Sequence, residues 1–137
     1  MAQVIGAKDI VHFTGYREDV VQIMSVSDII LLTSKYEGLP NVAVEAAMLR
    51  KVMVAYEVNG ISEILEDGRT GFIVRQGDID VLVKKLRMLA EEPGLRRKME
   101  KNLEALSLGS FSTRTMLDRK MEFYESIFRG MAEKRDN

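Results

Sequence analysis

Two short runs of apolar residues constrain the fold of this chain more than any other feature. One run covers residues 29–32 in the stretch DIILLTS, and the other opens the stretch VMVAYE, residues 52–57. Apolar runs without polar alternation are typical of strands that are buried on both faces, as in a parallel sheet. A helical pattern follows each run, from Asn41 to about Leu49 and again from Ile61. Strands that alternate with helices predict an α/β fold with a parallel sheet and right-handed crossovers.

The alternation continues on both sides of these two runs. Residues 9–13 and 72–74 are predicted to be two further strands, which makes four in all, and residues 18–27 are predicted to be a helix. After Gly77 the pattern becomes entirely helical. The helices predicted there cover residues 78–92, 95–106 and 113–129, with a break at Pro93.

The charge and residue composition argue against several classes of protein. Twenty basic residues against 21 acidic ones give a formal charge of −1, which disfavours a general nucleic-acid-binding protein. The chain has no cysteine and one histidine, so we expect no metal centre. It contains no apolar run long enough to cross a bilayer and no signal-peptide pattern at its N-terminus. We therefore expect a soluble, cytoplasmic protein.

The stretch SKYEGLPNVAVEAA, residues 34–47, is the candidate ligand site. It follows a predicted strand, and ligands of parallel sheets bind outside the carboxyl ends of the strands. Gly38 allows the backbone to approach a ligand closely, and Pro40 suits the start of a helix. The turn leaves three backbone amides free ahead of the helix, those of Leu39, Asn41 and Val42. These amides and the helix dipole favour an anion, most naturally a phosphate.

Two glutamates bracket this turn, with seven residues between them. Glu45, one turn inside the predicted helix, can accept hydrogen bonds from the hydroxyls of a ribose. Glu37, before the turn, can do the same for hydroxyls on the other side of the phosphate. The order hydroxyls, phosphate, hydroxyls is that of a nucleotide sugar. Acids near a helix N-terminus are also common because the dipole stabilises them, and the spacing alone favours that simpler interpretation.

Four sequence blocks, in one order, resemble a known family. They are VHFTGYREDV, SDIILLTSKYEGLPNVAVEAA, NGISEILEDGRTGFIV and FSTRTMLDRKMEFYESIF. From Val11 onward the chain resembles the C-terminal, donor-binding half of retaining glycosyltransferases with the GT-B fold, the glycosyl transferases group 1 family. The resemblance implies a Rossmann-like parallel sheet with flanking helices that ends in an all-helical C-terminal segment.

The resemblance also implies a role for each matching residue. Glu37 would be the catalytic residue, which contacts the hydroxyls of the donor sugar and stabilises positive charge that develops on it. Glu45 would hold the ribose, and Gly15 and Tyr16 would lie near the base. The backbone cradle for the distal phosphate would consist of Gly38, Leu39, Pro40 and Asn41. The donor would be a UDP-, GDP- or ADP-linked hexose, and neither a metal nor a further cofactor would be needed.

The chain departs from the family pattern in two places. The family carries a basic pair on βα units that precede the position of Val11, and it has an N-terminal half that binds the acceptor. Both are expected to be missing here, so we interpret residues 1–137 as one incomplete domain, with an α/β core over 9–92 and helices over 93–131. Arg50 and Val52 stand where the family has the Gly and Pro of a tight turn, so the sequence does not predict that turn.

Three functions therefore remain open at this point. The chain is expected to be the donor-binding part of a glycosyltransferase, inactive alone, with the N-terminal half as its missing partner. It could instead be one subunit of a split transferase, or a non-catalytic α/β interaction module. The apolar stripe of the predicted helix 113–129 predicts self-association, and the intact enzyme could lie at a membrane surface.

Overall fold

The fold is built on a small parallel sheet at the centre of the described residues. A computed structural model describes residues 7, 10–106, 118, 121 and 122. Its sheet contains β1 (Ile29–Leu32), β2 (Val52–Tyr56) and β3 (Gly71–Val74), all parallel and in the order β1-β2-β3. These two apolar runs of the sequence are thus neighbouring strands, paired from Ile29 opposite Val52.

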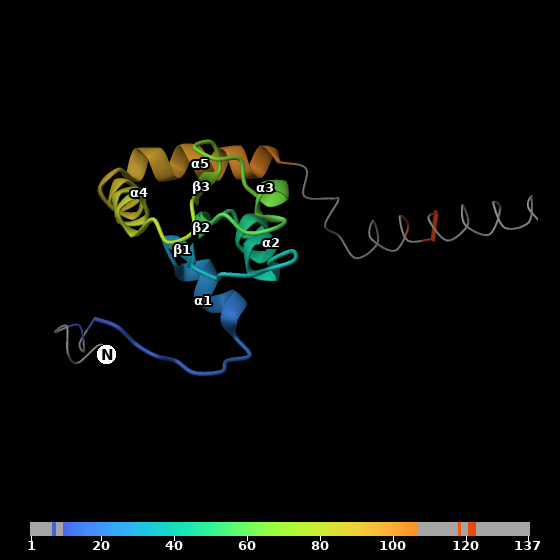
Figure 1. Ribbon diagram of the computed structural model, residues 1–137, viewed down its shortest axis with the longest axis horizontal. Coiled ribbons are helices and arrows are strands. Elements are labelled where there is room, and N and C mark those ends of the chain that lie inside the picture. The colour runs from blue at the N-terminus through green and yellow to red at the C-terminus, as the bar shows by residue number, and fades with distance from the viewer. Residues whose placement is uncertain (1–6, 8–9, 107–117, 119–120, 123–137) are drawn as a thin grey trace, which may run out of the picture.

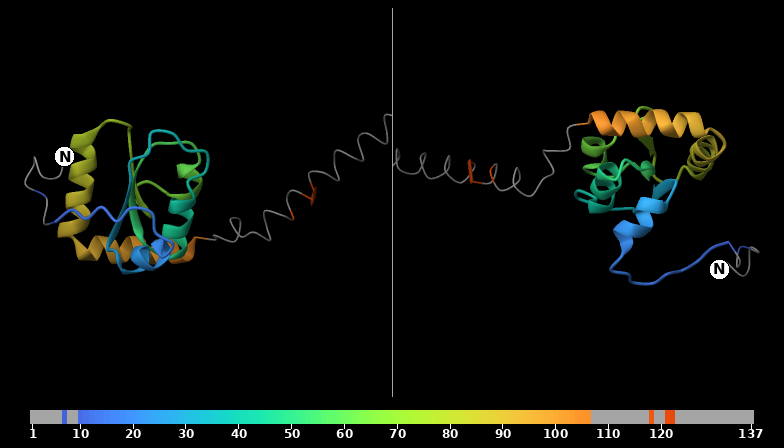
Figure 2. Two further views of the ribbon diagram at one scale, coloured as in Figure 1. Left: turned by 90° about the horizontal axis from the view of Figure 1, so that it is seen from below. Right: turned by 180° about the vertical axis from the view of Figure 1, so that it is seen from behind.

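Helices cover both faces of this sheet. They are α1 (Val20–Val26), α2 (Asn41–Met48), α3 (Ile61–Ile64), α4 (Ile79–Glu91) and α5 (Pro93–Ala105). Figure 1 shows α4 on one side of the sheet and α2 and α3 on the other, while α5 runs across the top of all three layers. The two further views confirm this arrangement (Figure 2). The predicted Rossmann-like α/β architecture is therefore confirmed.

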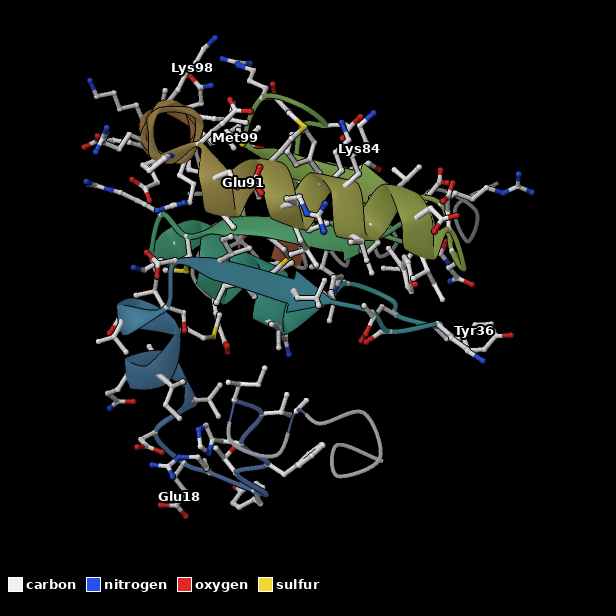
Figure 3. The ribbon with its side chains drawn as sticks, turned by 90° about the vertical axis from the view of Figure 1, so that its left-hand side faces the viewer. Glu18, Tyr36, Lys84, Glu91, Lys98 and Met99 are labelled. Atoms are coloured by element: carbon white, nitrogen blue, oxygen red, sulfur yellow. The ribbon has the colours of Figure 1, made fainter. Side chains whose placement is uncertain are left out.

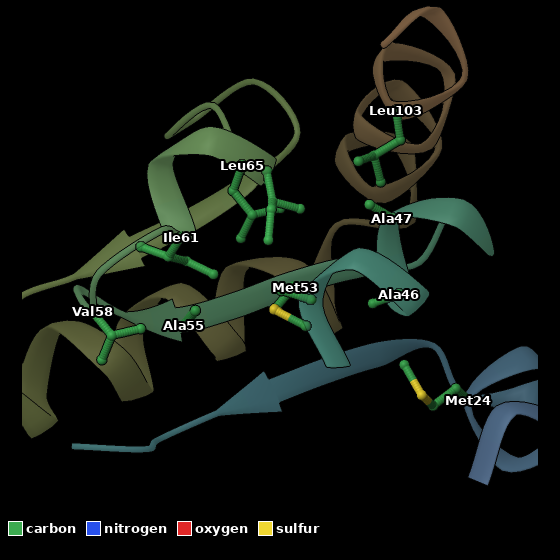
Figure 4. Close-up of a cluster of buried hydrophobic side chains, with 11 residues drawn as sticks. Met24, Ala46, Ala47, Met53, Ala55, Val58, Ile61, Leu65 and Leu103 are labelled. Atoms are coloured by element: carbon green, nitrogen blue, oxygen red, sulfur yellow. The ribbon is translucent and has the colours of Figure 1, made fainter. Parts of the chain in front are cut away.

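The middle strand β2 divides the core into two clusters. Alternate side chains of a strand point to opposite faces, and Val52 to Ala55 are all fully buried. Met53 and Ala55 pack against α2 and α3, in the cluster drawn in Figure 4. Val52 and Val54 pack on the other face, against residues of α4 and β3.

Helix α5 joins these two clusters. Leu103 belongs to the cluster on the α2 and α3 face, whereas Met99 belongs to the cluster on the α4 face. The side chain amide of Asn102 donates to the carbonyl oxygen of Arg69, just before β3, over 2.8 Å. Helix α5 therefore lies against the amino ends of the strands, away from the predicted ligand site.

The expectation of a fourth strand at residues 9–13 is wrong for the part of that stretch that the structure describes. Residues 10–13 form no strand and are exposed, with Phe13 at 84%. A strand needs a neighbour that supplies hydrogen bonds, and no described strand lies beside this segment. Two of its amides form local hydrogen bonds instead, since those of Ile10 and Val11 donate to the Ala7 carbonyl.

The tight turn that the sequence did not predict is present at the end of α2. The Lys51 amide donates to the Ala46 carbonyl over 2.8 Å, and the Arg50 amide donates to Ala47 over 3.0 Å. This pair of bonds is the Schellman motif, whose penultimate residue is left-handed and usually glycine. Arg50 takes that place with φ 57°. The hydrogen bonds of the turn thus hold an arginine where the family has glycine.

Two other expectations concern the C-terminal part of the chain. Helix α5 begins at Pro93, two residues before the predicted start, because proline is well tolerated in the first turn of a helix. The predicted helix over 113–129 lies almost wholly outside the described residues, so self-association through it stays a prediction. Among the described helices, none is long and apolar enough to cross a membrane.

Candidate functional site

A pocket of about 550 Å³ opens at the carboxyl ends of the three strands. The loop after β1 contributes residues 35–37, the loop after β2 and the start of α3 contribute residues 57–62, and β3 and the loop after it contribute Ile73 and Gln76. Carboxyl ends of parallel strands lie at one edge of a sheet, which explains why segments distant in sequence meet here. The pocket is therefore where the fold alone predicts a ligand.

The turn between β1 and α2 presents backbone donors beside this pocket. Pro40 is buried and precedes the helix with φ −72°, and its carbonyl accepts from the Ala43 amide over 2.9 Å. Within the described part of the chain, no acceptor is found for three amides, those of Leu39, Asn41 and Val42. Three unpartnered N–H groups at a helix N-terminus form a ready site for an anion.

Gly60, in the loop after β2, packs closely against this turn. Gly60 adopts φ 74°, and a Cβ atom there would lie only 2.5 Å from the Gly38 carbonyl oxygen and 3.1 Å from Leu39 Cα. Any larger residue would therefore displace the turn. Gly38 itself has open space around its own Cβ direction, so its side toward solvent is accessible to a ligand.

The two glutamates occupy different parts of the site. Glu37 is half-buried and lines the pocket, whereas Glu45 is half-buried on α2 and does not line it. Neither carboxylate forms an ion pair or hydrogen bond with another described side chain. Glu45 is the fifth residue of α2, beyond the first turn, where the dipole effect has fallen off. Attraction to the helix dipole therefore accounts less well for Glu45 than it would for an acid in the first turn.

Gly15 and Tyr16 lie apart from the pocket in this structure. They belong to the segment before α1, where Gly15 has φ 64° and Tyr16 is 92% exposed. Figure 3 shows Glu18 of this segment at the lower left, well apart from Tyr36 of the pocket at the right. The structure thus does not bring these two predicted residues to the other site residues, and their contact with a base stays a prediction.

Several pocket residues were not singled out from the sequence. Lys35 and Gln76 each follow a predicted strand and Glu57 ends one, and that position is the signal that could have found them. The side chain Nε2 of Gln76 donates a hydrogen bond to the carbonyl oxygen of Lys35. The described residues contain no group of three or more His, Asp or Glu side chains that could hold a metal ion.

Comparison with known proteins finds a family model and a curated relative that match the chain. The model of the family described as "Glycosyl transferases group 1" matches residues 1–105. A curated relative, the alpha-D-kanosaminyltransferase of Streptomyces kanamyceticus, is 30% identical over 124 residues. That alignment covers 89% of this chain and 32% of the relative, so the chain spans about a third of the length of that protein.

Solved structures show the same architecture. HepE of Anabaena, solved in complex with UDP and in another crystal with UDP-glucose, superposes with a TM-score of 0.83 at 27% identity. The superposition covers 91% of this chain and 35% of HepE. The C-terminal domain of a glycosyl transferase group 1 family protein from Francisella tularensis superposes with a TM-score of 0.70. It covers 82% of this chain and 59% of that domain, and its 22% identity concerns the fold alone.

Proposed function

Since the chain belongs to the glycosyl transferases group 1 family, we propose that it is the part of a retaining glycosyltransferase that binds the nucleotide-sugar donor. Its fold is the Rossmann-like fold that GT-B glycosyltransferases contain. In this proposal the whole enzyme transfers a hexosyl group with retained configuration, and its acceptor-binding half lies outside this chain. The chain alone is expected to bind the donor without transferring the sugar.

One observation carries this proposal, namely the three amides at the start of α2 for which the described residues supply no acceptor. They lie beside a pocket that holds Glu37, at the carboxyl edge of a parallel sheet. A diphosphate matches such a site because its oxygens only accept hydrogen bonds and its charge suits the positive end of the helix dipole. Lys35 adds a cationic side chain to the lining of the same pocket.

The proposed chemistry at Glu37 follows from the charge that develops during transfer. When the bond between the anomeric carbon and the phosphate oxygen breaks, the electron pair leaves with the diphosphate and the sugar becomes positive. The carboxylate of Glu37 stabilises that positive charge, and the amides before α2 stabilise the negative charge on the leaving group. Interactions that strengthen as charge develops lower the barrier rather than only binding the substrate.

Glu45 has a separate role in this proposal. It lies four residues after Asn41, about 6 Å further along the helix axis, and is half-buried with its carboxylate unpaired among the described residues. A carboxylate is negatively charged and only accepts hydrogen bonds. It therefore repels phosphate and recognises hydroxyl groups. It would therefore accept hydrogen bonds from the ribose of the nucleotide.

Isothermal titration calorimetry with UDP, GDP and ADP tests the proposal. We expect the wild-type chain to bind one of these nucleotides, and the Glu45→Ala variant to bind it about tenfold or more weakly, as for the loss of charge-assisted hydrogen bonds. Glu91→Ala is the matched control, because Glu91 is an exposed acid at the far end of α4. Binding of none of the three nucleotides, with the chain folded, would point instead to a non-catalytic module.

A further inference from the structure

The loop that carries Glu37 is tied to the far strand of the sheet by one side chain. Gln76 follows β3, and its Nε2 donates to the carbonyl oxygen of Lys35, which follows β1. The two residues are 41 positions apart, and β2 lies between their strands. Among the described side-chain hydrogen bonds, no other one connects the loops after β1 and β3. This bond therefore links the two loops that lie on either side of the end of β2.

The bond from Gln76 is close enough in the chain to restrain Glu37. Lys35 and Glu37 both line the pocket, and one residue separates them in the chain. Tyr36, between them, is 91% exposed, so its side chain adds little packing to hold the loop. Among the described hydrogen bonds, the one from Gln76 is the only one that reaches residues 35–37.

The phosphate turn is held by a different contact. Gly60, at the start of α3, packs against the Gly38 carbonyl and Leu39, and Pro40 is buried. These contacts do not involve Gln76. Removal of the Gln76 bond should therefore leave the phosphate turn in place while it loosens the loop of Glu37.

We propose that Gln76 is a positioning residue, which holds the Glu37 carboxylate in place for the hydroxyls of the donor sugar through the Lys35 carbonyl. This inference rests on the proposed function, because it assigns the sugar to Glu37 and the diphosphate to the turn. It predicts a split effect, in which the sugar part of the donor loses affinity and the nucleotide part does not.

A ligand-free measurement tests the positioning itself. Backbone order parameters from ¹⁵N relaxation of the wild-type chain are expected to be high for residues 35–37. Gln76→Met, which keeps the length of the side chain without its donor, is expected to lower them toward the flexible range, below about 0.6. Gln76→Lys, which restores an N–H donor, should recover them, and Gln22→Met, on exposed α1, should change nothing. Unchanged order in Gln76→Met would overturn the inference, whether or not a nucleotide binds.

Titration with UDP and UDP-glucose tests the consequence for the donor. Gln76→Met should weaken UDP-glucose about fivefold, as for the loss of one net hydrogen bond, and leave UDP within about twofold of wild type. Equal weakening of both ligands would show that Gln76 acts on the whole site and would overturn the inference. Wild-type protein that binds neither ligand would contradict the UDP form of the proposed function, and the relaxation measurement would still decide the role of Gln76.

Discussion

The two ends of the sheet differ in how their polar groups are satisfied. At the amino end, α5 crosses the strands and the Asn102 side chain caps the Arg69 carbonyl. Thr70, fully buried beside it, accepts from the Glu66 amide over 2.8 Å. At the carboxyl end, by contrast, the turn before α2 leaves three amides without a described acceptor.

This difference implies that the amino end of the sheet contributes mainly to stability and the carboxyl end mainly to ligand binding. Polar groups that are satisfied within the protein stabilise the fold and have nothing left to offer a ligand. Unsatisfied amides at a helix start contribute nothing to folding until an anion arrives. Substitutions at the amino end should therefore change the free energy of unfolding, and substitutions at the carboxyl end should change affinity.

The largest effect on stability is expected for Leu103→Ala. Leu103 is 1% exposed and packs in the cluster on the α2 and α3 face, so its truncation leaves a cavity. We expect a loss of about 3 kcal/mol in the free energy of unfolding, measured with urea by circular dichroism. Met48→Ala, at a position 64% exposed on α2, should stay within about 0.5 kcal/mol. A loss below about 1 kcal/mol for Leu103→Ala would show that α5 does not seal the amino end.

A smaller loss is expected for Thr70→Val, which removes a hydroxyl without removing volume. The Glu66 amide would lose its acceptor in a partly buried place, at a cost of about 1–2 kcal/mol. Thr33→Val makes the same chemical change at an exposed position after β1 and should cost little. Urea unfolding of both variants compares the two ends directly. Equal losses at Thr70 and Thr33 would contradict the contrast between them.

A difference in stability between two variants is expected at the turn after α2. Arg50 is left-handed with φ 57°, which disfavours any residue with a Cβ atom, so Arg50→Gly should be about 1 kcal/mol more stable than Arg50→Ala. Both variants lose the exposed ion pair of Arg50 with Glu104 at 3.0 Å, so their difference isolates the backbone. Thermal and urea unfolding measure it. Arg50→Gly less stable than Arg50→Ala would show that the turn is not left-handed.

The smallest effect concerns an exposed ion pair outside both ends of the sheet. Arg17 donates two hydrogen bonds to Asp19, which lowers the pKa of Asp19 below its ordinary 3.8 and raises that of Arg17. Because the folded pKa is lower, the pair stabilises the fold above the unfolded pKa and this contribution is lost as pH falls through the folded value. Carboxyl titration by NMR should show a midpoint below 3.8 in wild type and at the ordinary value in Arg17→Ala. An equal midpoint in both proteins would show that the pair does not persist in solution.

Much of the fold was predictable because its signals are local. The run Ile29–Leu32 is a strand with the expected bounds, and α2 begins at Asn41 as the Pro40 signal predicted. The error at residues 10–13 has a different origin. A strand depends on a partner elsewhere, and an apolar stretch of sequence does not show whether that partner is present.

The site was predictable only in part, for a similar reason. The amides before α2 follow from one continuous motif, since a helix start always leaves such donors. Gln76 and Gly60 reach the same place from other loops, and only the topology brings them there. The left-handed Arg50 was missed because the hydrogen bonds to Ala46 and Ala47 outweigh the preference of its side chain.

The central claim is that the open carboxyl end of the sheet, and not its sealed amino end, binds a nucleoside diphosphate. Amide chemical shifts of the ¹⁵N-labelled chain during titration with UDP test it residue by residue. We predict the largest changes at Leu39, Asn41 and Val42, and almost none at Lys51 and Arg69 of the amino end. Saturable changes at the amino end, with those three amides unmoved, would contradict the account.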